Sequence, residues 1–300
     1  MTDALEIRTV ASLARKVRSE VEAVASIVGE EAGAMAVLFY GSNLRTGSLD
    51  GVLDFYVLLP GKQAERIWPL VSYREHEVGG QTLRAKIATM SMAQFARAAR
   101  GDSKDTTIWT RFVQPSALVH ASNGEVRKSI ADALADAART AARFAAVLGP
   151  LEGVAEDFWR ALFQATYRAE FRVEKPGRED SILSVNAAHF EGLLTSAWDS
   201  AGISYANAGN GMLSPQLPEA ERARTLAEWR KRERLGKPLN ILRLAKATAT
   251  FDGAAHYGAW KLERHTGIRL EVTPFREKHP LLAMPGAAWD LWQARRKKRS

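Results

Sequence analysis

Two apolar runs joined through a Gly-Ser turn constrain this chain more than any other feature. Residues 35–40 end in Phe39-Tyr40, Gly41-Ser42 follows, and a second apolar run occupies residues 52–59. Continuous apolar runs of this length are typical of strands buried on both faces of a sheet. The pattern therefore predicts two buried strands, with the carboxylate of Asp54 near the start of the second.

The turn and the carboxylate carry residue types that suit phosphate and metal binding. Gly41 has no Cβ, so its backbone can approach a phosphate closely, and Ser42 supplies a hydroxyl. A helix that begins after the turn presents free N–H groups to an anion. Asp54 can hold Mg²⁺, which neutralises a triphosphate while it is positioned for in-line attack. This layout resembles the active site of a nucleotidyltransferase.

Tyr56 departs from the usual form of that site. Most nucleotidyltransferases begin the second strand with Asp-x-Asp, so that the i and i+2 carboxylates share one sheet face and one metal. Here Tyr56 stands at the second position. Either a carboxylate from another segment completes the site or the site is inactive. Gly-Ser is also an ordinary turn dipeptide, which leaves open a loop with Asp54 as a strand-edge residue.

Composition narrows the classes of function. The 300 residues are 46% hydrophobic, enough for one large core or two modest domains. The absence of Cys excludes disulfides and thiolate metal sites, and the six His show no His-Glu-x-x-His spacing. No window reaches about 18 uninterrupted apolar residues, so we expect a cytoplasmic protein, peripheral to the inner face of a membrane.

The charge distribution predicts an anionic membrane surface as a partner. The net charge is +8, and the chain ends with Trp289, Trp292 and five consecutive cations, Arg295 to Arg299. Indoles favour the headgroup level of a bilayer, and each cation adds roughly 1 kcal/mol near anionic lipid. A solvated basic tail, or one that meets nucleic acid, is the alternative. We expect membrane contact for residues 286–300 and packing within the protein for residues 239–264.

Periodicity predicts an α/β (α+β) protein whose N-terminal part contains a mixed sheet. We expect a first domain over residues 1–122, a mainly helical domain over 123–264 and a basic C-terminal segment over 265–300. The expected elements are helices over 4–30, 125–148, 153–174 and 180–200, strands over 35–40, 52–59 and 117–120, further extended or mixed segments over 68–73 and 82–90, and a loop over 202–218.

Five short segments, in order, resemble the mitochondrial-type phosphatidate cytidylyltransferases, the translocator assembly and maintenance family. They are Phe39-Tyr40-Gly41-Ser42, Leu53-Asp54-Phe55, Ala85-Lys86-Ile87-Ala88-Thr89-Met90-Ser91, Trp109-Thr110-Arg111-Phe112-Val113-Gln114-Pro115 and Thr166-Tyr167-Arg168-Ala169-Glu170-Phe171-Arg172. The resemblance covers about residues 35–200. Thr110, Gln114 and Glu170 depart from the family's Gly, basic residue and Asp.

The resemblance implies that CTP and phosphatidic acid react to give CDP-diacylglycerol and pyrophosphate, with Mg²⁺ as cofactor, on a nucleotidyltransferase fold. Glu170 would supply the carboxylate that Tyr56 does not, so Asp54 and Glu170 are the implied metal ligands and, with Lys86, the implied catalytic residues. The implied nucleotide-binding residues are Tyr40, Gly41, Ser42, Asn43, Ser91 and Arg111, and Arg172 is the implied substrate-binding residue.

Two other functions remain open on the sequence. The acceptor can be an RNA, a protein or a small molecule, although no aromatic-basic RNA-binding motif is present and we expect no nucleic acid partner. The chain can also be a catalytically silent membrane-binding protein of the same fold, which Tyr56 favours. Surface ion pairs are the ordinary role of residues such as Lys86, Arg111, Glu170 and Arg172.

Overall fold

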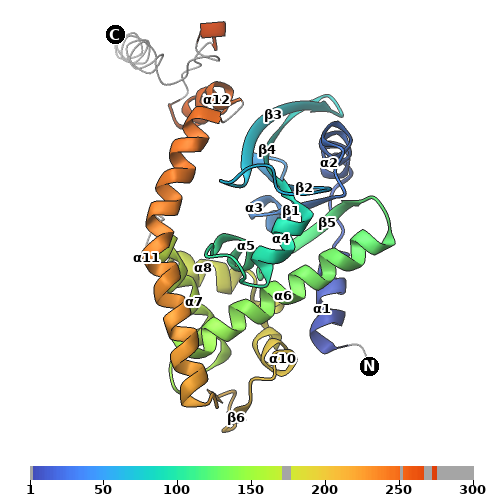
Figure 1. Ribbon diagram of the computed structural model, residues 1–300. Helices are drawn as coiled ribbons and strands as arrows, with labels where there is room; N and C mark the ends of the chain where they lie inside the picture. The colour runs from blue at the N-terminus through green and yellow to red at the C-terminus, as the bar shows by residue number, and fades with distance from the viewer. Residues whose placement is uncertain (1–2, 171–176, 251–252, 267–271, 276–300) are drawn as a thin grey trace.

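The computed structural model describes residues 3–170, 177–250, 253–266 and 272–275. It contains 56% helix and 19% strand around a mixed five-stranded sheet, which confirms the expected α/β class. Figure 1 shows the sheet on one side of the molecule and the long helix α11 on the other.

The sheet has the strand order β3-β4-β2-β1-β5. Strands β2 and β4 are parallel, and the other neighbours are antiparallel. The bounds are β1 Ala36–Tyr40, β2 Val52–Leu59, β3 Leu70–Val78, β4 Gln81–Ser91 and β5 Ser116–Ala121. Strands β1, β2, β4 and β5 lie within a few residues of the expected segments, because each is a compact apolar or alternating run bounded by turn residues. Strand β3 continues to Val78, five residues beyond the expected segment over 68–73.

Two apolar layers enclose the sheet. Alternate residues of β1 and β2, such as Val37 and Phe55, pack against helix α2 (Ser19–Ala32). The other face, which includes Leu38 and Leu58, belongs to a larger core with helices α4, α5 and α6. That core continues into the helical half of the chain as far as Trp229, so apolar packing crosses residue 122 without a break.

Alanine-rich α6 is the helix around which the others gather, and α1, α4, α5, α7, α10 and α11 all pack against it. Its small side chains allow close approach on several sides at once. The remaining helices are α1 Ala4–Leu13, α3 Ser42–Thr46, α4 Met92–Ala99, α5 Thr107–Phe112, α6 Gly124–Leu148, α7 Ala155–Glu170, α8 Arg178–Val185, α9 Ala187–Phe190, α10 Leu193–Ser200, α11 Glu219–Thr250 and α12 Ala254–Thr266.

Three expected elements are divided in the structure. The helix over 4–30 is two helices, α1 and α2, with residues 14–18 between them. The helix over 180–200 is three, because Asn186 and Gly192 end successive pieces. The loop over 202–218 contains a small hairpin, β6 (Tyr205–Asn207) with β7 (Leu213–Pro215).

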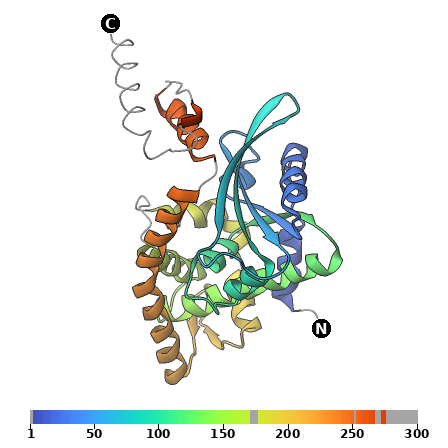
Figure 2. The same ribbon diagram turned by 45° about the horizontal axis from the view of Figure 1, so that its top comes forward.

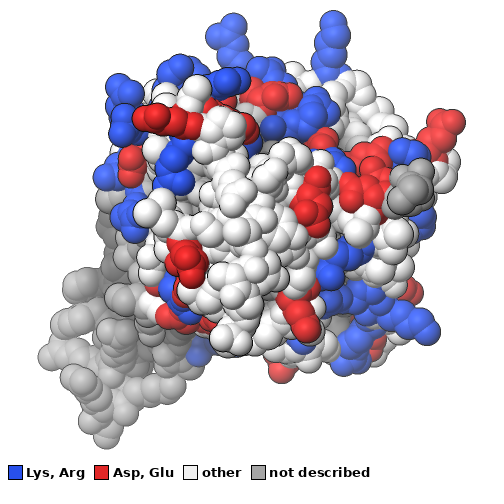
Figure 3. All heavy atoms as spheres, turned by 90° about the horizontal axis from the view of Figure 1, so that it is seen from below, with Lys and Arg blue, Asp and Glu red and all other residues white. Residues whose placement is uncertain are grey.

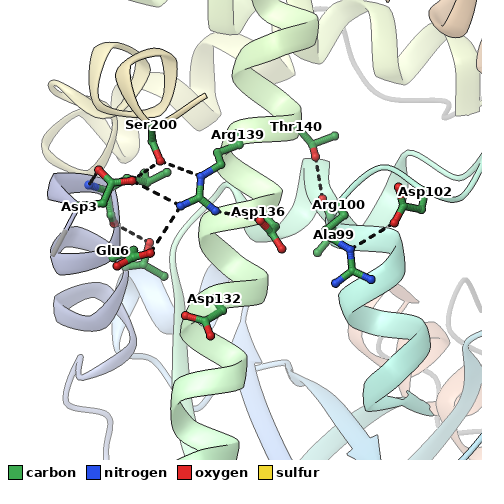
Figure 4. Close-up of polar contacts among 12 residues, drawn as sticks. Asp3, Glu6, Ala99, Arg100, Asp102, Asp132, Asp136, Arg139, Thr140 and Ser200 are labelled. Atoms are coloured by element: carbon green, nitrogen blue, oxygen red, sulfur yellow. Dashed lines mark hydrogen bonds and ion pairs between the residues drawn. The ribbon is translucent and has the colours of Figure 1, made fainter. Parts of the chain in front are cut away.

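Arg139 of α6 ties three helices together, as Figure 4 shows. Its guanidinium donates to Asp136 at 2.9 Å, to Ser200 at the end of α10 at 2.7 Å and to Asp3, the N-cap of α1, at 3.4 Å. Glu6 lies 3.8 Å away. One side chain therefore joins segments that are about 200 residues apart in sequence.

Among the described residues, no helix is both long and apolar enough to cross a membrane. The end of the molecule seen from below carries acidic and basic side chains around a central uncharged area (Figure 3). That face therefore does not concentrate the positive charge of the chain.

We expect Arg139→Met to lower the free energy of unfolding by about 1–2 kcal/mol, because several partly buried acceptors lose a charged donor together. Urea denaturation measures it. Lys128→Met, which breaks an exposed ion pair with Asp132 on the same helix, is the matched control and should have a smaller effect. Equal effects of the two variants would contradict a joining role for Arg139.

Candidate active site

A row of polar side chains crosses the sheet where β1 ends. Tyr40 of β1 pairs with Asp54 of β2, Asp54 pairs with Lys86 of β4, and Lys86 pairs with Tyr73 of β3. Side chains at paired positions lie on the same face of a sheet. The register therefore brings together Tyr40, Asp54 and Lys86, three of the residues expected at the site.

Gly41 presses the turn against Asp54. Its φ of +92° lies in the region that favours glycine, and a Cβ there would come within 2.9 Å of an Asp54 carboxylate oxygen. Any larger residue would displace either the turn or the carboxylate. The glycine thus allows the backbone after β1 to pass directly over the acid.

Arg111 of α5 lies over the same face of the sheet. Its guanidinium is 5.1 Å from the ring centre of Tyr40 and 5.7 Å from that of Tyr56, and it donates to the Tyr40 hydroxyl at 3.3 Å. Burial opposes its charge, but Tyr40, Tyr56, Glu170 and Asp54 attract it and hold the pKa of Arg111 above its ordinary value. A permanent cation therefore lies within the electrostatic reach of both predicted carboxylates.

Tyr56 is a buried member of the aromatic cluster under Arg111. Its side chain is only 1% exposed, and its ring packs edge-on against Phe112 at 5.2 Å and tilted against Phe95 at 6.4 Å. A phenol in this position adds a cation–π surface for Arg111 instead of a second metal ligand. The residue that breaks the Asp-x-Asp pattern thus supports a cation.

Glu170, at the end of α7, is buried and approaches the site from the helical half of the chain. Its carboxylate accepts a hydrogen bond from the Thr106 hydroxyl, and its backbone carbonyl accepts one from Asn240 of α11. Its charge acts on Arg111. The expectation that a later helix returns a carboxylate toward the Asp54 region is consistent with this arrangement, whereas a metal-ligand role for Glu170 stays a prediction.

Helix α11 adds a cation that the sequence reasoning did not assign to the site. Arg243 forms an ion pair with Asp105 and lies 4.9 Å from the ring centre of Trp68. Burial lowers its pKa from the ordinary value, and Tyr56 opposes that shift. The sequence alternates apolar and cationic residues over 239–247, a pattern that is compatible with an amphipathic helix. The pattern does not indicate which part of the protein Arg243 contacts.

The electrostatic state of Asp54 follows from its half-buried position. Burial raises the pKa of its carboxyl above the ordinary value, and the positive charges of Lys86 and Arg111 reduce that rise. The two cations therefore do not fully offset the cost of removing the carboxylate from water. A further cation at this carboxylate would stabilise its ionised form.

The donor set fits a magnesium ion that is held largely by its substrate. Magnesium is commonly bound by one or two carboxylates together with phosphates and water. Asp54 offers carboxylate oxygens, which are hard donors that suit Mg²⁺. The cost of burying its charge is only partly offset by Lys86 and Arg111, so a bound cation would stabilise it. Within the described ranges, no three His, Cys, Asp or Glu side chains gather as a ready-made metal cluster.

The turn residues after Gly41 have mainly structural contacts. Asn43 is buried, and its side-chain amide donates to the carbonyls of Ser48 and Asp50 at 2.9 and 2.8 Å, which closes the loop before β2. Ser42 is exposed, and its hydroxyl donates to the Asn43 side-chain oxygen at 3.3 Å. Helix α3 is only five residues long. Its dipole is accordingly small.

Ser91 lies apart from the group around Asp54. It is five residues beyond Lys86 on β4, about 16 Å along the strand. Its hydroxyl accepts from the Gln94 backbone N–H at 3.1 Å as the N-cap of α4. Arg172 and the tail over 286–300 lie outside the described residues.

No protein-family model matches this chain, and no curated protein matches it. The arrangement of Tyr40, Gly41, Asp54, Lys86 and Arg111 is therefore the basis on which a function is assigned.

We expect the stability advantage of Asp54→Asn over the unaltered protein to grow as the pH rises from about 4 to about 8. The folded state raises the pKa of Asp54, so it holds this proton more tightly than the unfolded state and loses stability as the proton leaves. Asparagine has no such loss. Urea denaturation across the pH range measures the difference.

Lys86→Met provides the matched background for that experiment. Without the positive charge of Lys86, the pKa of Asp54 should rise further, and Asp54→Asn should then stabilise the protein more at neutral pH. A stability advantage that shrinks with rising pH would contradict the raised pKa of Asp54.

Proposed function

We propose that this protein is a phosphatidate cytidylyltransferase, which joins CTP and phosphatidic acid to give CDP-diacylglycerol and pyrophosphate. One observation carries the proposal: Lys86 and Arg111 both act on a half-buried Asp54 against which a glycine turn is packed. Two cations beside one carboxylate suit a triphosphate with a bound divalent cation. The sequence resemblance supplies the identity of the nucleotide and of the acceptor.

The reaction is an in-line displacement at the α-phosphorus of CTP. An oxygen of the phosphatidic acid phosphate forms the new P–O bond, and the bond to the β-phosphate oxygen breaks, so that pyrophosphate leaves. A phosphate monoester is already anionic at neutral pH, so no general base is needed. Positioning and neutralisation of charge are sufficient sources of acceleration.

In this proposal each of the described side chains has a separate role. Lys86 supplies a compact charge and Arg111 a planar fork for phosphate oxygens, while Tyr40 and Tyr56 hold Arg111 in place. Asp54, with Glu170 as a predicted second ligand, would hold Mg²⁺, whose charge would offset that of the triphosphate. Arg243 of α11, which pairs with Asp105 and lines a neighbouring cavity, would bind the acceptor phosphate.

A cavity beside Arg243 supports a lipid acceptor. It has a volume of about 510 Å³ and is lined in part by Ile67, Trp68, Leu239 and Leu242. Its charged lining consists of four cations, Arg66, Arg97, Lys104 and Arg243, and three acids, Glu65, Asp102 and Asp105. The excess of positive charge beside apolar side chains suits a phosphate that carries acyl chains.

The outer face of α11 supports contact with an anionic membrane. Residues 240, 243 and 246 turn inward to bind Glu170, Asp105 and the Ile67 carbonyl. The opposite stripe, at helical spacing, consists of exposed Arg234, Lys237, Pro238 and Ile241. Figures 1 and 2 show α11 along one side of the molecule. Two cations beside an exposed isoleucine on the outer stripe suit the interface of an anionic membrane.

We expect purified protein with CTP, Mg²⁺ and phosphatidic acid in mixed micelles to release pyrophosphate, and Asp54→Asn to lower the rate at least about 100-fold. Asp50→Asn is the matched control, because this exposed acid lies in the loop just before β2, and its rate should stay within about twofold of the unaltered protein. Release without lipid, or with another acceptor alone, would replace phosphatidic acid in the proposal. No release with any nucleotide would contradict it and favour a catalytically silent fold.

We expect Ile241→Asn to bind anionic vesicles about threefold more weakly, because an apolar side chain no longer enters the headgroup region. Vesicle co-sedimentation measures it. Ile7→Asn, which alters a comparably exposed isoleucine on α1, is the matched control. Equal binding by both variants would exclude the α11 stripe as the contact.

A further inference from the structure

A second cavity lies away from the row around Asp54. It has a volume of about 350 Å³ and is lined by residues of α1, the end of α5, α6, α9 and the start of α10. Phe112, Leu134 and Leu193 provide apolar walls, whereas Arg8, Ser12, Arg15 and His189 provide polar ones. The volume is within the range of small-ligand sites.

Two arginines line this cavity, Arg8 half-buried and Arg15 exposed, and no carboxylate is among its lining residues. Arg8 donates from Nη2 to the carbonyls of His189 and Glu191, at 3.2 and 2.5 Å, which fixes its position. Over the described ranges, no ion pair involves Arg8 or Arg15. The cavity therefore has two positive charges that the protein does not neutralise locally.

His189 contributes a ring but little positive charge to this cavity. Its Nε2 is 2.9 Å from the carbonyl oxygen of Val113, and only a ring N–H can donate to that oxygen. Burial lowers its pKa from the ordinary value, the Val113 bond opposes that shift, and Arg15 and Arg8 lower the pKa further. At neutral pH the charge of the cavity is accordingly that of its two arginines.

We propose that this cavity binds a small dianionic phosphate monoester that carries an apolar group. The two arginines match the two charges, because guanidinium groups bind phosphate oxygens in pairs. The walls formed by Phe112, Leu134 and Leu193 match the apolar group. The site is separate from Asp54: Arg111 faces Tyr40, whereas the next residues, Phe112 and Val113, line the cavity.

Isothermal titration calorimetry of the full chain with phenyl phosphate tests this inference, with inorganic phosphate and benzyl alcohol as probes of charge alone and of the apolar group alone. We expect phenyl phosphate to bind more tightly than either. Arg15→Gln should weaken its binding at least about tenfold. Lys16→Gln is the matched control: it removes the same charge one residue away, from a side chain that does not line the cavity.

Ser12→Leu is a second variant, which fills the cavity without changing its charge and should also weaken binding. Asp54→Asn should leave phenyl phosphate binding unchanged, which separates this site from the proposed nucleotide site. Equal losses in Arg15→Gln and Lys16→Gln, unaltered binding in Ser12→Leu, or the absence of a binding heat would each overturn the inference.

The phosphate monoester can be a free metabolite or the headgroup of a lipid. Glycerol 3-phosphate in solution and vesicles that contain phosphatidic acid distinguish the two sources. Binding of glycerol 3-phosphate that depends on Arg15 supports a soluble ligand. Vesicle binding that depends on Arg15, without binding of glycerol 3-phosphate, supports a lipid headgroup. Dependence on Arg15 in neither arm contradicts a phosphate site.

Discussion

The buried charge of Arg111 is the interaction on which the arrangement of the site depends. A guanidinium removed from water requires nearby negative or aromatic groups, and this chain supplies Tyr40, Tyr56, Glu170 and Asp54. These groups come from β1, β2 and α7, so one charge draws together the sheet and the helical half of the chain. Tyr56, which looks like a defect in a two-carboxylate site, is a support for that cation.

The sheet and the helices position the groups around Asp54 in different ways. Strand register aligns Tyr40, Asp54 and Lys86 through backbone pairing, because paired residues share a face. By contrast, α11 reaches the same region through side-chain contacts, with Asn240 on the Glu170 carbonyl and Arg243 on Asp105. The first set is fixed by the fold, whereas the second depends on how α11 lies along it.

The amino-acid sequence was sufficient to predict strands β1 and β2, the turn at Gly41 and the place of Asp54 near the start of β2, since these follow from local apolar runs and turn chemistry. It did not reveal Arg243 or Thr106, because their contacts join residues far apart in the chain and leave no periodic signal. Ser91 illustrates another limit of sequence: a residue near Lys86 in the chain lies about 16 Å farther along an extended strand, where it caps α4.

The state of the Asp54 carboxyl, followed by carbon-13 NMR as the pH is varied, tests the central claim most directly. Without ligands, the account predicts a pKa above that of an ordinary aspartate, because burial outweighs Lys86 and Arg111. With CTP and Mg²⁺ added, the pKa should fall, since a divalent cation held at this carboxylate favours its ionised form. A pKa that CTP and Mg²⁺ leave unchanged would contradict a nucleotide and metal site at Asp54.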